Sequence, residues 1–318
     1  MTRALHPFSL PTLLLATLSG LGLPAQNLVA NPGFEAGNTA FSSDYSYSSS
    51  GNCCEGQYTV NGAPNTFNMF FAVPPAASPG SSQMMVVNGS IVPNQRVWYV
   101  NVPVTQGTTY RLQFAGCTAV AGGPAILQWQ IAGQLIGSPL PLPNVTQIWQ
   151  VSGATWVANV TGTVEVAIRN LNTSAFPNDF YIDDVYVGPC TGCWENYGSG
   201  WPGAQGTPNL VPSATPVLGT TIDFTMTTVR PTPELGVLAL GIAPTSLPTP
   251  LGGTLLVVPI VLEGGVLPAA PTPWTIALVI PNDPSLNGFE VYAQFAHTDP
   301  STSQGFAFSR GLKLVVGL

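Results

Sequence analysis

The sequence predicts an all-β protein, with an N-terminal jelly-roll β-sandwich followed by a second, smaller C-terminal β-sandwich. Three features of the composition favour this class. Only 7% of the 318 residues are charged, whereas an ordinary soluble domain carries roughly 25%. The chain holds 34 glycines and 32 prolines, which end helices and make turns. Val, Thr, Phe, Tyr and Trp are abundant, and these residues favour strands.

The charge and the apolar segments exclude two classes of protein. Seven Lys and Arg against fourteen Asp and Glu give a net charge of -7, which excludes a protein that follows nucleic-acid phosphates. A membrane-spanning helix needs roughly 18 or more apolar residues. The best internal stretches, 235–243 and 255–262, are short and bounded or broken by Gly and Pro. We therefore expect no transmembrane segment once the N-terminus has been processed.

The first 26 residues have the pattern of a secretory signal peptide. Arg3 precedes an apolar stretch from Phe8 to Leu23, and the small residue Ala25 follows. An uncleaved membrane anchor is the alternative, which Pro11 and Pro24 make less favourable. The mature chain is then expected to begin near Asn27 and to be secreted or held at the cell surface.

Two blocks of short β-rich segments follow, separated by a Gly- and Pro-rich linker at 189–208. The first block, 27–188, holds runs rich in β-branched and aromatic residues with turn residues between them, which is typical of a sandwich or jelly roll. The second block, 209–318, has the length and strand content of a second small β-sandwich. The expected strands are 57–60, 83–88, 96–102, 109–115, 125–132, 147–151, 155–160, 162–170 and 179–187 in the first block, and 220–227, 236–242, 254–261, 275–280, 289–298 and 311–316 in the second.

Ordered motifs in the first block resemble the galactose-binding-like jelly roll of secreted carbohydrate-binding modules. The opening, 27–35, reads Asn-Leu-Val-Ala-Asn-Pro-Gly-Phe-Glu, and the close, 180–186, reads Phe-Tyr-Ile-Asp-Asp-Val-Tyr. The segments 84–90, 97–104 and 107–110 fall between them in the order of that family. The resemblance implies a jelly roll that binds a polysaccharide or a cell-surface glycan.

The second block resembles a C-terminal β domain common in exported proteins of environmental bacteria. The shared features are 197–203, the Pro281-Asn282 segment with 292–294 after it, and the closing strand. A cysteine of that group is replaced here by Trp201. The resemblance attaches no catalytic activity to this block, and we expect it to act as a spacer or attachment module.

Three acidic residues are candidates for a structural calcium ion. Glu35 lies at the end of the opening motif, and Asp183 and Asp184 lie in the closing strand. The first and last strands of such a jelly roll lie close together, and the resemblance implies a calcium ion there; calcium is held by oxygen ligands. Adjacent residues of a regular strand point to opposite faces, so only one of Asp183 and Asp184 is expected to bind unless a bulge intervenes. The alternative is that these acids accept backbone hydrogen bonds in turns.

Aromatic residues with Asn and Gln neighbours are candidates for a sugar platform, since the C–H faces of sugars stack on aromatic rings. Against this interpretation, large aromatic residues more often fill cores. Trp98 and Tyr99 must point to opposite faces of one strand, so at least one is expected in the core. Loop tyrosines are stronger candidates, because loops carry binding sites. The ligand-binding candidates are Tyr45, Tyr47, Trp98, Trp129 and Trp156.

Five cysteines in an exported chain predict disulfides, with one cysteine left over. We expect Cys190 to pair with Cys193, and one of Cys53 and Cys54 to pair with Cys117. Spacing alone does not define these connections.

The acid–base groups are too sparse to predict an enzyme. Glu55, Glu165 and Asp179 lie in no shared motif, and His297 is the only histidine after Asn27. We therefore predict a secreted, non-catalytic, glycan-binding protein of the cell surface or extracellular matrix. A structural or adhesive protein without a sugar site is the alternative, and a cryptic glycoside hydrolase is the third. The sequence does not indicate the ligand or the oligomeric state.

Overall fold

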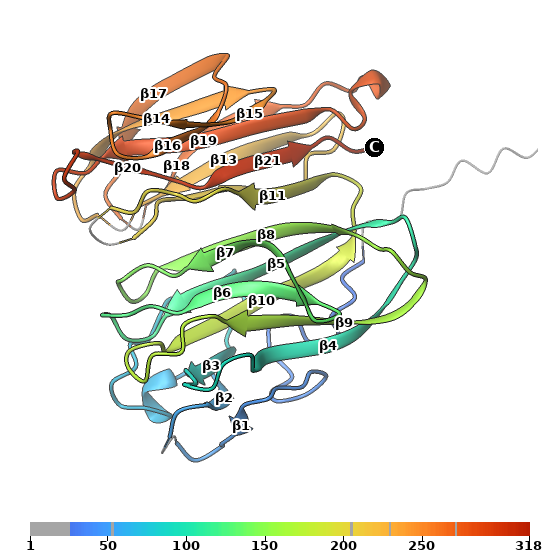
Figure 1. Ribbon diagram of the computed structural model, residues 1–318, viewed down its shortest axis with the longest axis vertical. Helices are drawn as coiled ribbons and strands as arrows, with labels where there is room; N and C mark the ends of the chain where they lie inside the picture. The colour runs from blue at the N-terminus through green and yellow to red at the C-terminus, as the bar shows by residue number, and fades with distance from the viewer. Residues whose placement is uncertain (1–25, 52–53, 204–205, 229, 271) are drawn as a thin grey trace, which may run out of the picture.

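A computed structural model describes residues 26–51, 54–203, 206–228, 230–270 and 272–318. The predicted all-β class is confirmed, since the regular elements of these residues are strands apart from two short 3-10 turns, η1 (Pro64–Thr66) and η2 (Pro284–Leu286). The strands form two stacked β domains (Figure 1). The predicted signal peptide lies outside the described residues except for Gln26. No described helix is long and apolar enough to cross a membrane.

The first domain is a sandwich of a six-stranded and a four-stranded sheet (Figure 1). The six-stranded sheet has the order β1 (Ser46–Tyr47), β2 (Gln57–Asn61), β3 (Met84–Asn88), β10 (Phe180–Pro189), β5 (Thr109–Thr118) and β8 (Trp149–Val157). The four-stranded sheet has the order β4 (Arg96–Val104), β9 (Gly162–Asn170), β6 (Ile126–Ile131) and β7 (Gln134–Pro141). All neighbours are antiparallel except the short β1–β2 pair.

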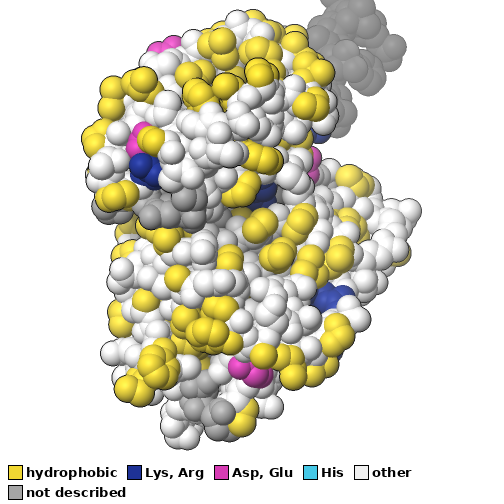
Figure 2. All heavy atoms as spheres, turned by 60° about the vertical axis from the view of Figure 1, so that its left-hand side comes forward, with side chains coloured by type: hydrophobic (Ala, Val, Ile, Leu, Met, Phe, Trp, Pro, Cys, Tyr) yellow, Lys and Arg dark blue, Asp and Glu magenta, His cyan; other side chains and the backbone are white. Residues whose placement is uncertain are grey.

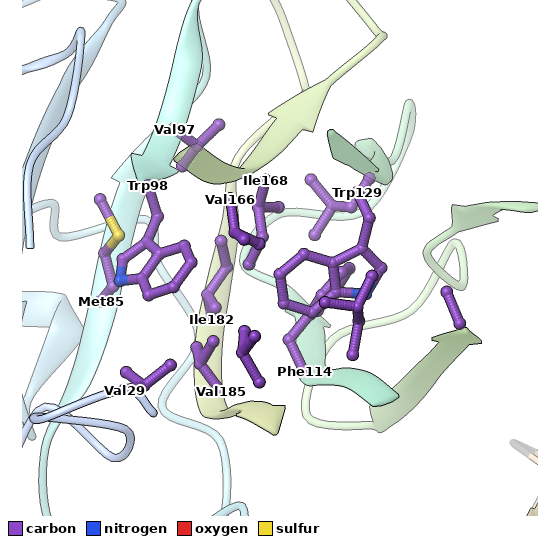
Figure 3. Packing of buried hydrophobic residues seen from close by; sticks show 14 of the residues in the cluster. Val29, Met85, Val97, Trp98, Phe114, Trp129, Val166, Ile168, Ile182 and Val185 are labelled. Carbon is purple, nitrogen blue, oxygen red and sulfur yellow. The ribbon is translucent and has the colours of Figure 1, made fainter. Parts of the chain in front are cut away.

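The core of this domain is built from the inward residues of both sheets. Trp98 from β4, Trp129 from β6 and Phe114 from β5 meet there in edge-to-face contacts, with ring centroids 6.4 Å apart for the two tryptophans and 5.2 Å apart for Phe114 and Trp129 (Figure 3). Such contacts are a favoured arrangement of aromatic rings. The side chains at alternate positions along β4, β6 and β9 therefore point away from the core.

The second domain packs a sheet of six strands against one of three. The larger sheet contains β11 (Cys193–Tyr197), β21 (Gly311–Val315), β19 (Glu290–Thr298), β14 (Glu234–Gly241) and β17 (Val261–Leu267), with β20 (Phe306–Phe308) beside β19. The smaller sheet contains β12 (Asn209–Pro212), β13 (Thr221–Thr227) and β18 (Trp274–Val279), and a hairpin joins β15 (Pro244–Pro248) to β16 (Thr254–Val257). Phe224, Phe295 and Leu312 are among the residues that fill the core between the sheets.

The segment 189–208, predicted as a linker, contains strand β11. This strand pairs with β21 along its whole length, and Trp194 is buried in the core of the second domain. Strand β11 also contacts β8 of the jelly roll (Figure 1). The Gly-rich composition suggested a linker because the pairing partner of β11 lies more than a hundred residues later in the chain.

Strand β8 was predicted as two strands, 147–151 and 155–160, and it is continuous. Gly153 divides the two predicted strands in the sequence, and in the structure it lies against the Trp194 ring. A Cβ atom on Gly153 would overlap that ring. Close approach of another domain therefore explains this glycine, which often weakens a strand.

One predicted disulfide is present and one is wrong. Cys190 and Cys193 are bonded, as predicted. Cys117 is free and buried in β5, so its predicted bond to Cys53 or Cys54 is wrong. Cys54 takes part in a disulfide, and Cys53 lies outside the described residues. Burial raises the pKa of the Cys117 thiol to about 12, as expected for a thiol that serves as apolar packing.

Candidate functional site

The predicted sugar platform is corrected at two tryptophans. Trp98 is 0% exposed and Trp129 is 1% exposed, and both fill the core. Neither can contact a ligand, so their assignment as binding residues is wrong. The alternation argument required one of Trp98 and Tyr99 to be in the core, and the structure selects Trp98.

The other three predicted aromatic residues lie in different settings. Tyr45 is buried, and its hydroxyl oxygen accepts a hydrogen bond from the Ser90 N–H at 3.2 Å, so it has a structural role. Trp156 lies on β8, partly buried against Tyr110, with ring centroids 6.0 Å apart. Tyr47 is 46% exposed and keeps its place as a surface candidate.

The outward residues of the four-stranded sheet form a polar layer, which we call the open face; Gln128, Gln130 and Arg169 within it are buried. Matched positions run across the strands: Tyr99 lies beside Ala167, which lies beside Gln130. Arg169 lies between Arg96 and Gln128 in the same way. The open face consists of Arg96, Tyr99 and Asn101 on β4, Glu165 and Arg169 on β9, and Gln128 and Gln130 on β6.

Arg96 is fixed at one edge of the open face. Its guanidinium pairs with Asp44 at 2.7 Å and with Glu165 at 2.6 Å, and its central carbon lies 3.8 Å from the centroid of the Tyr99 ring. The hydrogen bond from Arg96 holds the pKa of the Asp44 carboxyl below its usual range. Asp44 is positioned because the backbone of Ser42 pairs with Tyr99 and extends the sheet beyond β4. The Arg96 side chain is thus held in one conformation before any ligand arrives.

Arg169 differs from Arg96 in making no direct ion pair with a described carboxylate, although its charge contributes to lowering the pKa of Asp44. Its side chain is 9% exposed, and its Nε–H has no hydrogen-bond partner among the described residues. No described carboxylate lies within ion-pair distance of it, whereas both carboxylates near Arg96 are paired with Arg96. A buried polar group without a partner costs about 1–3 kcal/mol, and more when charged. The cost would be recovered by a ligand that accepts hydrogen bonds from Arg169.

A group of tyrosines borders the open face. The rings of Tyr47 and Tyr58 meet at a centroid distance of 5.4 Å, and the Tyr58 hydroxyl donates to Asn38 Oδ1 at 2.9 Å. The Tyr58 ring also lies 6.1 Å from the ring of Phe41, the residue before Ser42, whose backbone pairs with Tyr99 at the edge of the open face. Tyr47 therefore belongs to the rim of the same surface.

Sequence reasoning missed most of the open face. Gln128 and Gln130 donate to the carbonyl oxygens of Gly137 at 2.6 Å and Gly133 at 2.9 Å, respectively. The available signal was the alternation Ile-Leu-Gln-Trp-Gln-Ile along 126–131, which places both glutamines opposite Trp129. The search for large aromatic residues favoured the tryptophan and passed over its polar neighbours.

The three predicted calcium ligands converge at the join between the first and last segments of the jelly roll. A β-bulge between Asp183 and Tyr186 puts Asp184 at φ 51°, so the two aspartates do not alternate as in a regular strand. Asp183 accepts from Ser81 Oγ at 2.6 Å, and Asp184 accepts from Ser78 Oγ at 2.9 Å. Glu35 accepts from Ser82 N at 2.7 Å.

These acids are oxygen donors of the kind that calcium takes, and each already has hydrogen-bond donors. Burial raises the pKa of Asp183 to about 7, with further contributions from Asp184 and Glu35. Burial also raises the pKa of Asp184, whereas hydrogen bonds from Ser82 lower that of Glu35. Across the described ranges, no group of three or more His, Cys, Asp or Glu side chains is arranged to hold a metal ion. The donor chemistry fits calcium, and the geometry is that of a hydrogen-bonded cluster.

The acid–base candidates are engaged in structural contacts. His297 is buried, its ring stacks on Phe295 at a centroid distance of 5.7 Å, and burial lowers its pKa. Glu165 pairs with Arg96. Asp179 accepts from the Gly89 N–H at 3.0 Å, and burial raises its pKa to about 6.

The chain matches no family model and no curated protein. Three solved structures resemble parts of it. The CBM22-1 xylan-binding domain of Xyn10C from Paenibacillus barcinonensis is 12% identical, over 50% of this chain and 91% of that one, with a TM-score of 0.34. The EclA C-terminal domain, a sugar-binding protein, is 18% identical, over 36% and 89%, with a TM-score of 0.27. A Paenibacillus xanthan lyase is 15% identical, over 77% of this chain and 24% of that one, with a TM-score of 0.30.

Proposed function

We propose that the chain is a secreted, non-catalytic carbohydrate-binding protein and that the open face is its glycan site. The observation that carries the proposal is Arg169, a buried side chain on the outward side of β9 whose Nε–H has no hydrogen-bond partner among the described residues. The N-terminal pattern of residues 1–26 and the Cys190–Cys193 disulfide support export, because disulfides persist in oxidising compartments.

The groups around Arg169 suit a neutral or weakly acidic sugar chain. Sugar hydroxyls need both donors and acceptors, and Asn101, Gln128 and Gln130 supply amides on neighbouring strands. Tyr47 offers an exposed ring at the rim for the C–H face of a sugar. Arg96 is already held by Asp44 and Glu165, so ordering it costs little on binding. We infer that the glycan lies across β4, β9 and β6.

The absence of catalysis is part of the proposal. Glycoside hydrolysis needs one carboxylic acid and one carboxylate on either side of the scissile bond. On the open face, Asp44 and Glu165 both pair with Arg96, and the hydrogen bond from Arg96 lowers the pKa of Asp44, which favours its ionised form over a proton donor. A hydrolase remains the weakest candidate. Turnover of any polysaccharide that is lost in Glu165→Gln would establish it.

Glycan-array and polysaccharide-retention measurements on the mature chain, 27–318, test the binding proposal. We expect retention by at least one polysaccharide, weakened at least tenfold by Arg169→Gln and by Tyr47→Ala. The matched controls are Arg111→Gln and Tyr186→Ala on the six-stranded sheet. These two residues form a cation–π contact, with the central guanidinium carbon 4.1 Å from the ring centroid. Retention by no polysaccharide would reject a sugar site. Equal losses in the two sets of variants would reject the open face as its location.

A structural or adhesive protein is the second candidate, because the second domain has a broad apolar surface. Hydrophobic side chains gather on this domain (Figure 2), and β17, at the edge of its sheet, is exposed at most positions. The exposed side chains of this sheet include Leu235 on β14 and Leu262 and Val266 on β17. Unpaired edge strands can pair with another chain, so this candidate predicts self-association through β17. Sedimentation equilibrium separates the two: a monomer at high concentration rejects this candidate, and association lost in Leu262→Lys supports it.

We further propose that Glu35, Asp183 and Asp184 bind a structural calcium ion. Without a cation, the charges of Asp184 and Glu35 add to the cost of ionising Asp183. Ligand that binds only the folded state stabilises it by about 2.7 kcal/mol at a hundredfold excess over Kd. Calcium should therefore raise the melting temperature of the wild type and leave that of Glu35→Gln unchanged. Identical melting curves with calcium and with chelator, in both proteins, would leave the acids as hydrogen-bond acceptors only.

A further inference from the structure

The two domains meet along β8 and β11, and this contact is built from specific side chains. Gly153 N–H donates to Asn196 Oδ1 at 3.1 Å, and Thr155 Oγ1 donates to Glu195 at 2.6 Å. Trp194 lies over Gly153 between them. The contact therefore fixes the residues on either side of it relative to one another.

A cleft of about 460 Å³ lies along this contact. One wall comes from the jelly roll, from Ser138 to Leu142 with Asn144 and Gln150. The other comes from the second domain, from residues within 196–203 and 206–210 and from Arg310. The second wall is rich in glycine and proline and has few bulky side chains, which leaves room in the cleft. Its volume lies within the range of small-molecule sites, roughly 300–1,000 Å³.

Arg310 is the single cationic residue of the cleft lining. It is 7% exposed, and its guanidinium donates to Val151 O at 3.2 Å and Asn196 Oδ1 at 3.1 Å. The remaining terminal nitrogen, Nη1, has no partner among the described residues, and burial lowers the pKa of Arg310 to about 10.

Arg310 has no ion-pair partner among the described residues. Arg230, elsewhere in the same domain, pairs with Glu234 at 2.7 Å and with Asp299 at 2.8 Å. No acidic residue lines the cleft beside Arg310, and none of the ion pairs among the described residues includes it. A buried charge is retained at low cost only when it is paired, so the expected partner of Arg310 is an anion from outside the chain.

The rest of the lining narrows the chemistry of that anion. One guanidinium without a second cation matches a single negative charge, as in a carboxylate. Asn144, Gln150 and Asn196 contribute amides that suit hydroxyl groups, and Pro141, Pro208 and other apolar residues contribute flat C–H surface. A ring that bears hydroxyls and one carboxylate satisfies all three kinds of group.

We propose that the cleft between the domains binds a hexuronate, with its carboxylate on Arg310 and its hydroxyls on the surrounding amides. This site is separate from the open face and does not depend on glycan binding there. Binding of the hexuronate would then depend on the packing of the two domains, because each domain supplies one wall of the cleft.

Isothermal titration of the mature chain with D-glucuronate and D-galacturonate tests the proposal, with D-glucose as the neutral control of equal ring size. We expect at least one uronate to bind at least tenfold more tightly than glucose. Arg310→Gln should weaken that binding at least tenfold, and Arg111→Gln on the six-stranded sheet, outside both proposed sites, should leave it unchanged. Neither uronate binding, or glucose binding as tightly, would overturn the proposal.

Ser199→Trp is a second variant, which tests the cleft even if Arg310→Gln fails to fold. Ser199 is exposed and lines the cleft, so a tryptophan there fills the space without touching the β8–β11 contact. We expect this variant to keep the wild-type melting temperature and to lose uronate binding. Uronate binding that survives in both Ser199→Trp and Arg310→Gln would place the ligand elsewhere and overturn the proposal. Loss in Arg169→Gln alone would assign the uronate to the open face instead.

Discussion

The two sheets of the jelly roll differ in what covers their outer faces. On the six-stranded sheet, Phe67 and Phe71 from the segment after β2 pack over Val86 and Tyr181. Further along the same sheet, the second domain covers β8 at Gly153. The outer face of the four-stranded sheet instead carries Arg, Gln, Asn, Glu and Tyr side chains. The chain thus covers one sheet with its own apolar groups and lines the outer face of the other with polar side chains.

The same difference is visible in the strands. Strand β3 reads Met-Met-Val-Val-Asn and is buried at every position, because both of its faces are covered. Strand β6 alternates apolar and polar residues, so its outward side chains are polar, although it is also buried at five of its six positions. The first predictions change residues that pack on the outer face of the six-stranded sheet. The last one changes a residue beside the four-stranded sheet.

Loss of Trp194 should have the largest effect. This residue is buried in the second core and lies on Gly153 of the jelly roll. Replacing a buried aromatic residue with alanine costs about 3–5 kcal/mol. Trp194→Ala should lower the free energy of unfolding by that amount in denaturant titrations. Trp201→Ala, at a partly exposed tryptophan, should cost less; an equal cost would show that Trp194 does not hold the domains together.

Adding one methyl group at the same contact should have a smaller effect. A Cβ atom on Gly153 would overlap the Trp194 ring, whereas one on Gly264 of β17 would have its nearest neighbour, Gly236 O, at 3.9 Å. Overpacking costs about 1–3 kcal/mol. Thermal unfolding should therefore show a lower melting temperature for Gly153→Ala and no loss for Gly264→Ala. A Gly153→Ala protein as stable as the wild type would mean that the domains separate at little cost.

Asp179, beside the six-stranded sheet, and Asp44, beside the four-stranded sheet, should make the free energy of unfolding depend on pH in opposite directions. Burial raises the folded-state pKa of Asp179 to about 6, so the folded protein binds that proton more tightly than the unfolded chain. Its contribution is present below about pH 4 and is lost as the pH rises to about 6, by roughly 1–3 kcal/mol. Asp179→Asn should remove this slope from the free energy of unfolding.

Asp44, beside the open face, should change stability with pH in the opposite direction. The Arg96 hydrogen bond lowers its folded-state pKa, so the ion pair stabilises the fold at neutral pH and is lost as the pH falls through that pKa. Asp44→Asn should therefore reduce stability at pH 7 and have little effect at low pH. Exposed pairs contribute about 0–1 kcal/mol, so this is the smallest effect. Slopes of the same sign in the Asp179→Asn and Asp44→Asn proteins would contradict the contrast.

Local patterns were sufficient for the strands and for features set by near neighbours. Strand alternation placed Trp98 and Tyr99 on opposite faces, and the Cys190–Cys193 pair followed from close spacing in a chain expected to be exported. Sequence could not say which face would become the core, because that depends on how the other sheet closes over it. The state of Cys117 was missed for a similar reason, since its surroundings come from η1 and β10.

Features that arise from docking were beyond local patterns. Strand β11 is stabilised by β21 and Trp194 by both domains, so a Gly-rich segment was taken for a linker. The environment of Arg310 exists only after the domains pack, and the open face emerged only when Arg96, Gln128 and Arg169 were brought side by side from three strands.

Hydrogen–deuterium exchange of the mature chain, with and without the polysaccharide that it retains most strongly, tests the central claim most directly. If the open face is the glycan site, polysaccharide should slow exchange in β4, β6 and β9, and leave β3 and β10 unchanged. Protection confined to the six-stranded sheet, or to the second domain, would contradict the account.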